Sequence, residues 1–208
     1  PGVHTVGVGQ PILIGAHANP GCIFVNWEVA EGNATIADPR AITTTVVVED
    51  AGGATVYANM AEATTLTMVA DPPEGGTTLP APGTITVPAG ELIPIGAIPT
   101  RPGYIFRAWE AVAGHPFIAE PGNITTTVIL GPEPTTIVAH FAQETTLSIH
   151  PSPWYGGHTA PPAGEHTVIV GDPVPIAAFA NPGYFFAIWD VTDGNATLGN
   201  PDAITTTV

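Results

Sequence analysis

Three carboxylates at matching positions are the first residues whose type and spacing could support chemistry. Each directly follows a tryptophan, and the tryptophans lie 82 (109 − 27) and 80 (189 − 109) residues apart. The three pairs are Trp27-Glu28, Trp109-Glu110 and Trp189-Asp190. A general acid and its partner base must lie close to the same reacting atoms, so one carboxylate in each distant copy does not form such a pair. We therefore expect these carboxylates to make local hydrogen bonds or to lie at strand edges.

Other residue types that bind metals or transfer protons are scattered along the chain. The seven histidines form neither a His-Glu-x-x-His motif nor a closely spaced pair, so we expect surface or half-buried positions for them. A zinc site at His158 and His166 is the alternative. Acidic turn residues precede each Thr-rich segment, as in Asp38-Pro39 and Glu120-Pro121. We predict no cofactor; calcium bridging such turns is the one candidate, although no Asp-x-Asp-x-Asp loop is present.

Short motifs point to modification rather than to catalysis. There is no Gly-x-Ser-x-Gly motif, no phosphate-binding loop and no Ser/His/Asp order, so we predict that the chain is not an enzyme. Three Asn-x-Thr sequons occur, at Asn33, Asn123 and Asn195. They are glycosylation sites in a host that modifies them and ordinary turn residues in most bacteria.

The tryptophans belong to a segment that occurs three times, at residues 19–27, 101–109 and 181–189. Each copy begins with Pro-Gly, which favours a turn, and continues as an apolar and aromatic run, which favours a strand. The recurrence of aromatic residues at one repeat position indicates core packing rather than stacking on glycans. Strict alternation would place the second and third aromatic positions on opposite faces, so either both faces are covered or a β-bulge intervenes. The expected core residues are Phe24, Trp27, Phe106, Trp109, Phe186 and Trp189.

The middle copy contains a complete set of predicted strands separated by turn residues. They cover residues 64–70, 84–87, 91–98, 104–112, 124–130 and 135–142, with Pro94 marking a sheet edge or bulge and residues 71–83 forming a loop. No segment shows helical periodicity, and 24 prolines exclude long helices. The sequence therefore predicts an all-β fold, a tandem array of small Ig-like β-sandwich repeats of about 80 residues each.

The repeat is out of phase with the two ends of the chain. We predict a first unit at residues 1–63 that lacks its first strand, a complete second unit at 64–144, and a third unit at 145–208 that lacks its closing strand. Either the chain is a window of a longer array, or a strand passes between subunits head to tail. The uncharged edge expected to take part in assembly comprises Ile204, Thr205, Thr206, Thr207 and Val208.

Composition limits the partners. The net charge is −15, with three arginines and no lysine, so nucleic acid and anionic membranes would repel the chain. No apolar run is long enough to cross a bilayer. The single cysteine, Cys22, is expected to be a buried apolar residue, with an intermolecular disulfide or a reactive thiol as alternatives. The chain has neither an initiating methionine nor a signal peptide, which suggests processing or an incomplete sequence.

The order of these elements resembles the divergent InlB B-repeat family of bacterial extracellular modules. The resemblance rests on a Gly-Tyr-x-Phe-x-x-Trp segment, a loop, a Thr-rich strand and a closing segment, Ala139-His140-Phe141 in the middle copy. It covers all three units. The chain departs from the pattern at Cys22, at Met60 and in its incomplete terminal units. The resemblance implies an extracellular or cell-surface location and a stalk, adhesin or structural role, without catalytic residues.

These observations predict a non-enzymatic extracellular structural protein that forms a stalk or filament. Its partners would be copies of itself or adjacent repeats of a longer chain, with no nucleic acid and no membrane insertion. The alternative is a surface adhesin or glycan-binding module. Trp154 and Tyr155 would make the contacts in that case, because they lie in a loop with no aromatic counterpart at residues 71–83.

Overall fold

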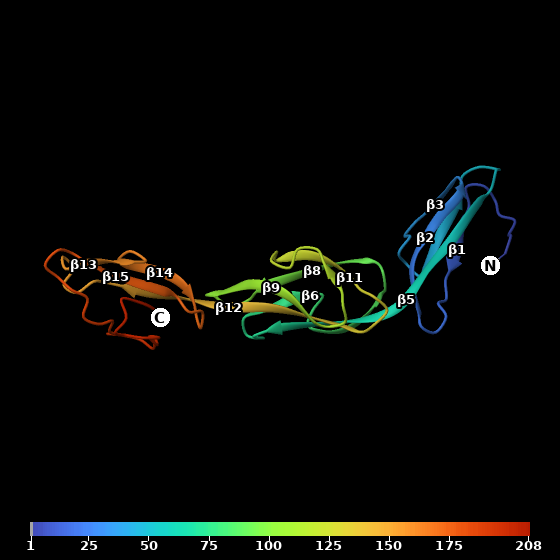
Figure 1. Cartoon of the computed structure of the whole chain (residues 1–208). Helices are drawn as coiled ribbons and strands as arrows, with labels where there is room; N and C mark the ends of the chain where they lie inside the picture. Colours follow the sequence, from blue (N-terminus) through green and yellow to red (C-terminus); the bar gives the residue numbers. More distant parts are fainter. Residues whose placement is uncertain (1) are drawn as a thin grey trace.

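The computed structural model describes residues 2–208, so Pro1, the first residue of the predicted first unit, lies outside the described residues. Those residues form strands, turns and loops arranged as three β-rich lobes in a row (Figure 1), which confirms the predicted tandem β-sandwich array. None of the described segments is a helix with the length and apolar character needed to cross a membrane.

Sixteen strands account for the regular structure of the described residues. They are β1 (Pro11–Gly15), β2 (Cys22–Gly32), β3 (Ala34–Ile36), β4 (Thr43–Val48), β5 (Ala54–Asp71), β6 (Gly76–Leu79), β7 (Gly83–Pro88), β8 (Leu92–Pro99), β9 (Tyr104–Ala113), β10 (Phe117–Ile118), β11 (Thr125–Ile129), β12 (Thr135–Ile149), β13 (Gly157–Ala160), β14 (Gly164–Ile169), β15 (Pro175–Ala180) and β16 (Thr205–Thr207).

The middle lobe, here called the second unit, is a sandwich of two sheets. One sheet contains β7, β5, β12 and β9, and the other follows the order β10-β11-β8-β6. The side chains between the sheets form the main core cluster, and Leu66, Ile137 and Val128 in it are fully buried. Burying each such side chain contributes about 1.5–3 kcal/mol, so this interface supplies most of the stability of the unit.

The alternation of residue types in β5 explains how one strand lines the core. Thr64, Leu66 and Met68 are buried, while the intervening Thr65 and Thr67 are less buried. Thr67 lies within hydrogen-bond distance of Thr84 on β7, with 2.8 Å between the two hydroxyl oxygens. The period of two thus places the apolar face inward and the threonine face outward.

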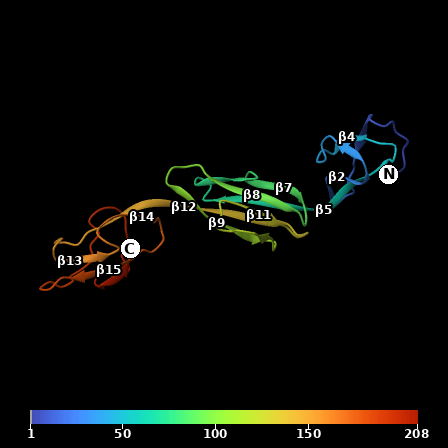
Figure 2. The ribbon, with the colours of Figure 1, turned by 90° about the horizontal axis from the view of Figure 1, so that it is seen from above.

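Two long strands run from one lobe into the next. Figure 2 shows β5 joining the first lobe to the second and β12 joining the second lobe to the third. The first unit consists of β1–β4 with residues 54–62 of β5, and the third unit consists of β13–β16 with residues 144–149 of β12. The sequence predicted separate closing and first strands at these places. It missed β6 and β10, and also their counterparts β13 and β3 in the other units. The prediction of residues 71–83 as loop is therefore wrong for Gly76–Leu79, because these residues pair with β8.

The Pro-Gly segments form the predicted turns. Gly21, Gly103 and Gly183 have φ angles of +82°, +81° and +88°. In the second unit, the amide of Tyr104 donates to the carbonyl of Arg101 at 3.2 Å, which closes the turn. Only glycine adopts such a φ without strain, and proline before it fixes the preceding angle. Pro94 lies where β8 pairs with β11 but not with β6, so the expectation of a local sheet edge is also confirmed.

A β-bulge resolves the alternation problem in the aromatic strand. Phe106 pairs with Phe141 and Ala108 pairs with His140, so Arg107 is the extra residue. The rings of Phe106 and Trp109 therefore lie on the same side, with centroids 5.2 Å apart. Of the two alternatives that the sequence left open, the structure shows the bulge, and the pairing of β2 with β5 has the same irregularity after Phe24.

The prediction that Cys22 is buried is wrong, because the thiol is exposed. Tyr104 occupies the equivalent position in the second unit and is partly buried against the core cluster. A Cβ at Gly75 would lie 2.6 Å from the Tyr104 ring, so the loop that follows β5 covers that ring. The described part of the first unit contains no equivalent loop, so Cys22 is not covered by any residue between 2 and 208 in the way that Tyr104 is.

Candidate functional site: the closing-strand position of the repeats

The three repeated tryptophans are fixed by the same hydrogen bond. The indole nitrogens of Trp27, Trp109 and Trp189 donate to carbonyl oxygens at 3.1, 3.0 and 3.1 Å, in each case to the residue 14 positions later. Their burial differs, since Trp27 is 8% exposed and Trp109 is 3% exposed, whereas Trp189 is only partly buried. The loop that follows each aromatic segment thus forms in all three units. The burial of the indole differs between the units.

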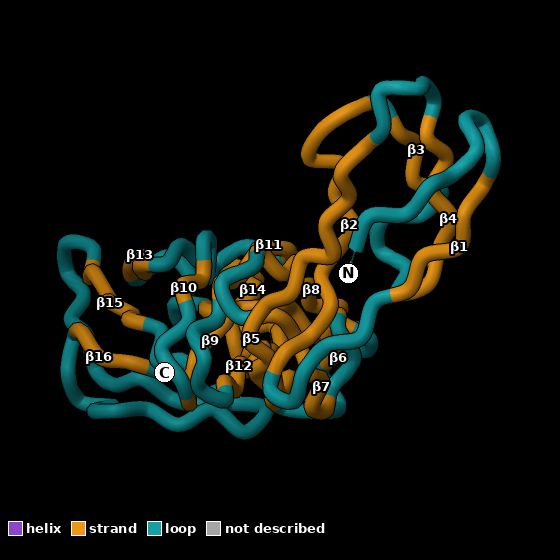
Figure 3. The backbone as a smooth tube through the Cα atoms, turned by 90° about the vertical axis from the view of Figure 1, so that its right-hand side faces the viewer, coloured by secondary structure: helices purple, strands orange, loops and turns teal. Residues whose placement is uncertain are grey.

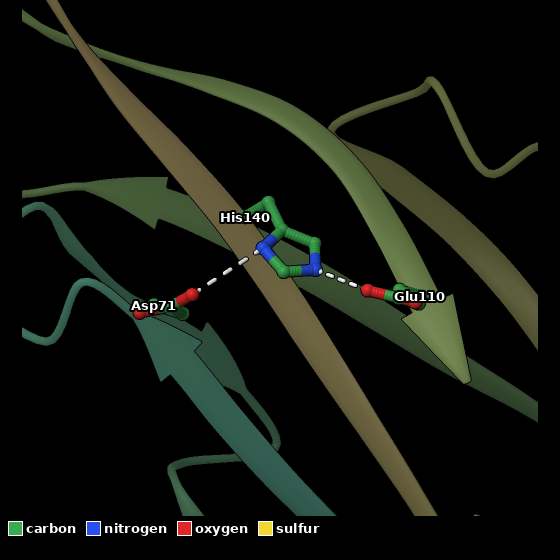
Figure 4. A network of polar contacts seen from close by, with 3 residues as sticks. All are labelled: Asp71, Glu110 and His140. Carbon is green, nitrogen blue, oxygen red and sulfur yellow. Dashed lines mark hydrogen bonds and ion pairs between the residues drawn. The ribbon is translucent and has the colours of Figure 1, made fainter. Parts of the chain in front are cut away.

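The carboxylates that follow the tryptophans bind a residue on the closing strand. Glu28 accepts a hydrogen bond from the amide of Asn59 at 2.9 Å, and Glu110 lies 2.7 Å from the Nε2 atom of His140. Figure 4 shows His140 on β12 between Glu110 on β9 and Asp71 on β5. The expected hydrogen-bonding role is confirmed for these two acids. Sequence reasoning missed the third partner, Asp71, because the parallel pairing of β5 with β12 joins residues far apart in the chain.

The closing strand of the second unit fills a position between two neighbours. Residues 135–140 of β12 pair with β5 in parallel, and residues 136–143 pair with β9 in the antiparallel direction. Ile137 and Ala139 are fully buried, and Phe141 is 5% exposed. The closing strand therefore completes both the hydrogen bonding of its sheet and the core of the unit.

The corresponding position in the third unit holds no strand among residues 2–208. Residues 144–149 of β12 pair with β14 on one side only, and residues 184–194 belong to no strand. Figure 3 shows the whole stretch between β15 and β16 as loop. The equivalents of Leu66 and Thr64, at 0% and 4% exposure, are Leu147, which is half-buried, and Thr145, which is exposed. Within residues 2–208, residues 145–149 and 184–191 therefore lack the strand that pairs with their equivalents in the second unit.

Exposed aromatic residues cluster beside this position. Trp154 is 80% exposed and Tyr155 is 55% exposed, and the two rings meet edge to face with centroids 5.5 Å apart. The ring of Tyr155 also lies 5.9 Å from that of Tyr184, which is 46% exposed. The structure thus places both predicted contact residues on the surface and adds Tyr184 to them.

The other predicted site residues lie apart from this position. Residues Thr205–Thr207 pair with β15, and the amide and carbonyl of Val208 bond to Val174, so this strand is occupied within the chain and its role in assembly stays untested. Asn33, Asn123 and Asn195 are exposed. The Nε2 atom of His166 donates a hydrogen bond to the Pro162 carbonyl at 2.7 Å. In the described part of the chain, no three His, Cys, Asp or Glu residues are grouped as a metal site would require.

Comparison with known proteins agrees with this repeated architecture. No curated protein and no solved structure gave a significant match. The divergent InlB B-repeat domain matches the chain twice, over residues 64–145 and over residues 149–208. Because these matches cover more than half of the residues, the chain belongs to the divergent InlB B-repeat family, whose members are bacterial repeat modules generally located outside the cell or at its surface.

Proposed function

We propose that the chain is part of an extracellular stalk or filament in which neighbouring repeats share strands. The observation that carries this proposal is the continuity of β5 and β12, since each is the last strand of one unit and the first strand of the next. A force along such a strand acts on backbone hydrogen bonds in both units at once. The family and the all-β fold point to a structural rather than a catalytic role.

We also propose that the units divide at residues 63/64 and 144/145. This division is supported by the places where the long strands change partners. The amide of Ala63 donates to Gly21 at 2.9 Å, and the amide of Glu144 donates to Gly103 at 2.7 Å. Both bonds join a shared strand to the glycine of a Pro-Gly turn, so the two junctions use the same connection.

The junction between the second and third units has an additional brace. Arg107, the bulged residue of β9, forms an ion pair with Asp172 at 2.8 Å, and the amide of Val170 donates to the carbonyl of Gln143 at 2.9 Å. The ion pair is exposed and contributes at most about 1 kcal/mol, so it orients the units more than it stabilises them. The position equivalent to Arg107 in the first unit is Val25, which cannot form this pair.

Small-angle X-ray scattering of the chain in solution tests the extended arrangement. A compact protein of this length has a radius of gyration of about 17 Å. The spine formed by β5 and the distal part of β12 spans roughly 85 Å at the usual rise per strand residue, which gives a radius of gyration of about 25 Å. A value near that of the compact protein would contradict the stalk.

A proline at the second junction tests whether the shared strand couples the units. Glu144→Pro removes the amide that donates to Gly103, and Glu144→Ala keeps it. We expect the proline variant to unfold in two separate transitions and to give a broader distribution of scattering distances than the alanine control. Identical behaviour of the two variants would show that the units are not coupled through β12.

A second candidate function is an adhesin that binds glycans through the aromatic cluster. It is favoured by the exposure of Trp154, Tyr155 and Tyr184, because aromatic faces at a surface are suitable for stacking on sugars. A glycan array tests it with Trp154→Ala, and Tyr57→Ala serves as control because Tyr57 is 57% exposed on the first unit. Binding that only Trp154→Ala abolishes would support the adhesin.

A further inference from the structure

The charged strand residues of the chain belong to only one of the two sheets in each unit. The other sheet, here called the small sheet, is β1-β4-β3 in the first unit, β10-β11-β8-β6 in the second and β13-β15-β16 in the third. Among residues 2–208, no strand of a small sheet contains an aspartate, glutamate, lysine or arginine, although the net charge is −15. The charged strand residues lie in the sheet that contains β5 and β12, as Glu28, Glu110 and Glu165 do in the three units.

The outer face of the small sheet in the second unit exposes large apolar side chains. In β8, Ile95 belongs to the core cluster, so Leu92 and Ile98, at an odd number of positions from it, lie on the opposite face. The strand register places Phe117 of β10 and Leu79 of β6 on this same face. These four side chains are between 42% and 66% exposed. This surface, here called the uncharged face, is exposed although the second unit has a neighbour on each side.

The same face recurs in the other two units. In the first unit, Leu13 of β1 is 72% exposed and pairs with Thr45 of β4. In the third unit, Phe179 of β15 is exposed, and its ring stacks on that of His158 with centroids 4.9 Å apart. Exposed apolar side chains that gather on one face mark interaction surfaces in soluble proteins. The recurrence shows that this property belongs to the repeat.

We infer that the uncharged face is the surface through which a second copy of the chain packs side by side with the first. The inference goes beyond the proposed function, because the stalk requires only that units be joined end to end. The partner is identified by the distribution of charge and by the area of the face.

The distribution of charge limits self-association to this face. The chain has 18 acidic residues and three arginines, so contact through the charged sheets would bring carboxylates of two copies together. Packed sheets lie about 10 Å apart, so two copies joined through their uncharged faces would keep their charged sheets about 30 Å apart. This separation is about three Debye lengths at 0.1 M salt, so the repulsion between those sheets is largely screened. Acidic loop residues next to the small sheet, such as Glu91 and Glu120, leave a repulsion that salt reduces.

The area of the face determines how many units must pair. Four strands about 17–20 Å long at a spacing of about 4.8 Å give a face of roughly 350 Å². A standard stable interface buries about 800 Å² per partner. Contact through a single unit is therefore weak, and consecutive units that pair together reach the required area. Side-by-side packing thus strengthens with the number of repeats in the chain.

Sedimentation velocity of the intact chain, at concentrations up to about 1 mM, measures this association. We expect a reversible equilibrium between monomer and dimer. Raising the salt concentration from about 0.01 M to about 0.1 M shortens the Debye length from about 30 Å to about 10 Å, so the association should strengthen several-fold.

Charged substitutions locate the contact surface. Leu92→Glu adds a carboxylate to the face of each copy and should weaken the association by about tenfold or more, and Phe117→Glu should do the same from another strand. Val112→Glu is the matched control, because Val112 is 55% exposed on β9, which belongs to the charged sheet. This control should leave the association unchanged. Circular dichroism of each variant separates a loss of folding from a loss of association.

Three results would overturn the inference. They are a chain that stays monomeric at about 1 mM in 0.1 M salt, an association that Val112→Glu weakens as much as Leu92→Glu does, and an association that salt weakens, which would indicate pairing through charged groups. Monomeric behaviour together with retention on an uncharged polysaccharide resin that Leu92→Glu abolishes would assign the face to a sugar ligand instead. The radius of gyration extrapolated to zero protein concentration tests the stalk alone, so the stalk and the side-by-side packing can fail independently.

Discussion

The second and third units share a sequence pattern but differ in closure. In the second unit, Trp109 is 3% exposed and Leu66 is fully buried, whereas their equivalents, Trp189 and Leu147, are only partly buried. The two units nevertheless share local hydrogen bonds: both tryptophans donate to the carbonyl 14 residues later, and both Pro-Gly turns close with the same bond.

The difference lies in the closing strand and not in the loops. The amide of Gly75 donates to Pro72 at 2.9 Å, and the amide of Gly156 donates to Pro153 at 2.8 Å, so even the turn beside the closing-strand position is preserved. Short-range sequence information thus builds the loops of each unit on its own. Burial of the core requires a strand between the first strand and the aromatic strand, and this strand also belongs to the next unit. Stability in such an array is shared between neighbours.

Truncation of Leu66 and of its equivalent Leu147 should give the largest difference in stability loss between the second and third units. Leu66→Ala creates a cavity in a closed core and should lower the stability of the second unit by about 2–5 kcal/mol. Leu147→Ala should cost less than half as much, because water already reaches part of its side chain. Hydrogen exchange resolved by unit, measured by mass spectrometry in increasing denaturant, gives both values. Equal losses would mean that the third unit is as closed as the second.

Glycine-to-alanine substitutions beside the closing strand test the same difference between the second and third units, by adding a methyl group instead of creating a cavity. A Cβ at Gly75 would lie 2.6 Å from Tyr104 and 2.9 Å from Phe141, so Gly75→Ala overpacks the second unit and should cost about 1–3 kcal/mol. At Gly156, the nearest atoms belong to Tyr184 and Pro153, at 3.2 Å.

Gly156→Ala should therefore cost less than Gly75→Ala, because the Tyr184 ring and the Pro153 carbonyl, both 3.2 Å away, need to shift by only a few tenths of an ångström. Thermal unfolding of each single variant, compared with the parent chain, measures the two losses of stability. A loss at Gly156 as large as that at Gly75 would show that the third unit is already tightly packed around Tyr184.

The sequence predicted the features that depend on neighbouring residues and missed those that depend on distant pairing. The repeat, the Pro-Gly turns, the bulge between Phe106 and Trp109 and the all-β class follow from local residue types. Cys22 is exposed, contrary to prediction, because a covering loop is absent from the described part of its unit. The approach of Asp71 to His140 depends on the parallel pairing between β5 and β12, and residue patterns do not reveal such register.

A threonine hydroxyl caps the same loop in all three units, so its removal should lower the stability of each unit by the same amount. Thr126 accepts a hydrogen bond from the amide of Glu120 at 3.0 Å, and Thr206 accepts one from the amide of Asn200 at 2.8 Å. Thr126→Val and Thr206→Val should each cost about 0.5–1.5 kcal/mol, the usual net value of one hydrogen bond. Unit-resolved hydrogen exchange checks them, with serine at each position as the control that keeps the hydroxyl. A clearly larger loss in one unit would mean that the loops, too, depend on closure.

The smallest expected effect concerns His140, which lies between Glu110 and Asp71. The first unit uses Asn59 at the equivalent position, with its amide bonded to Glu28 at 2.9 Å, so an amide satisfies this carboxylate as well as an imidazole does. His140→Asn should therefore change the stability of the second unit by no more than about 0.5 kcal/mol, since the cluster is exposed and surface ion pairs are weak. His140→Leu, which keeps the bulk and removes the donor, should cost more than His140→Asn in chemical denaturation. If the leucine variant were as stable as the asparagine variant, the hydrogen bond to Glu110 would not contribute to the stability of the second unit.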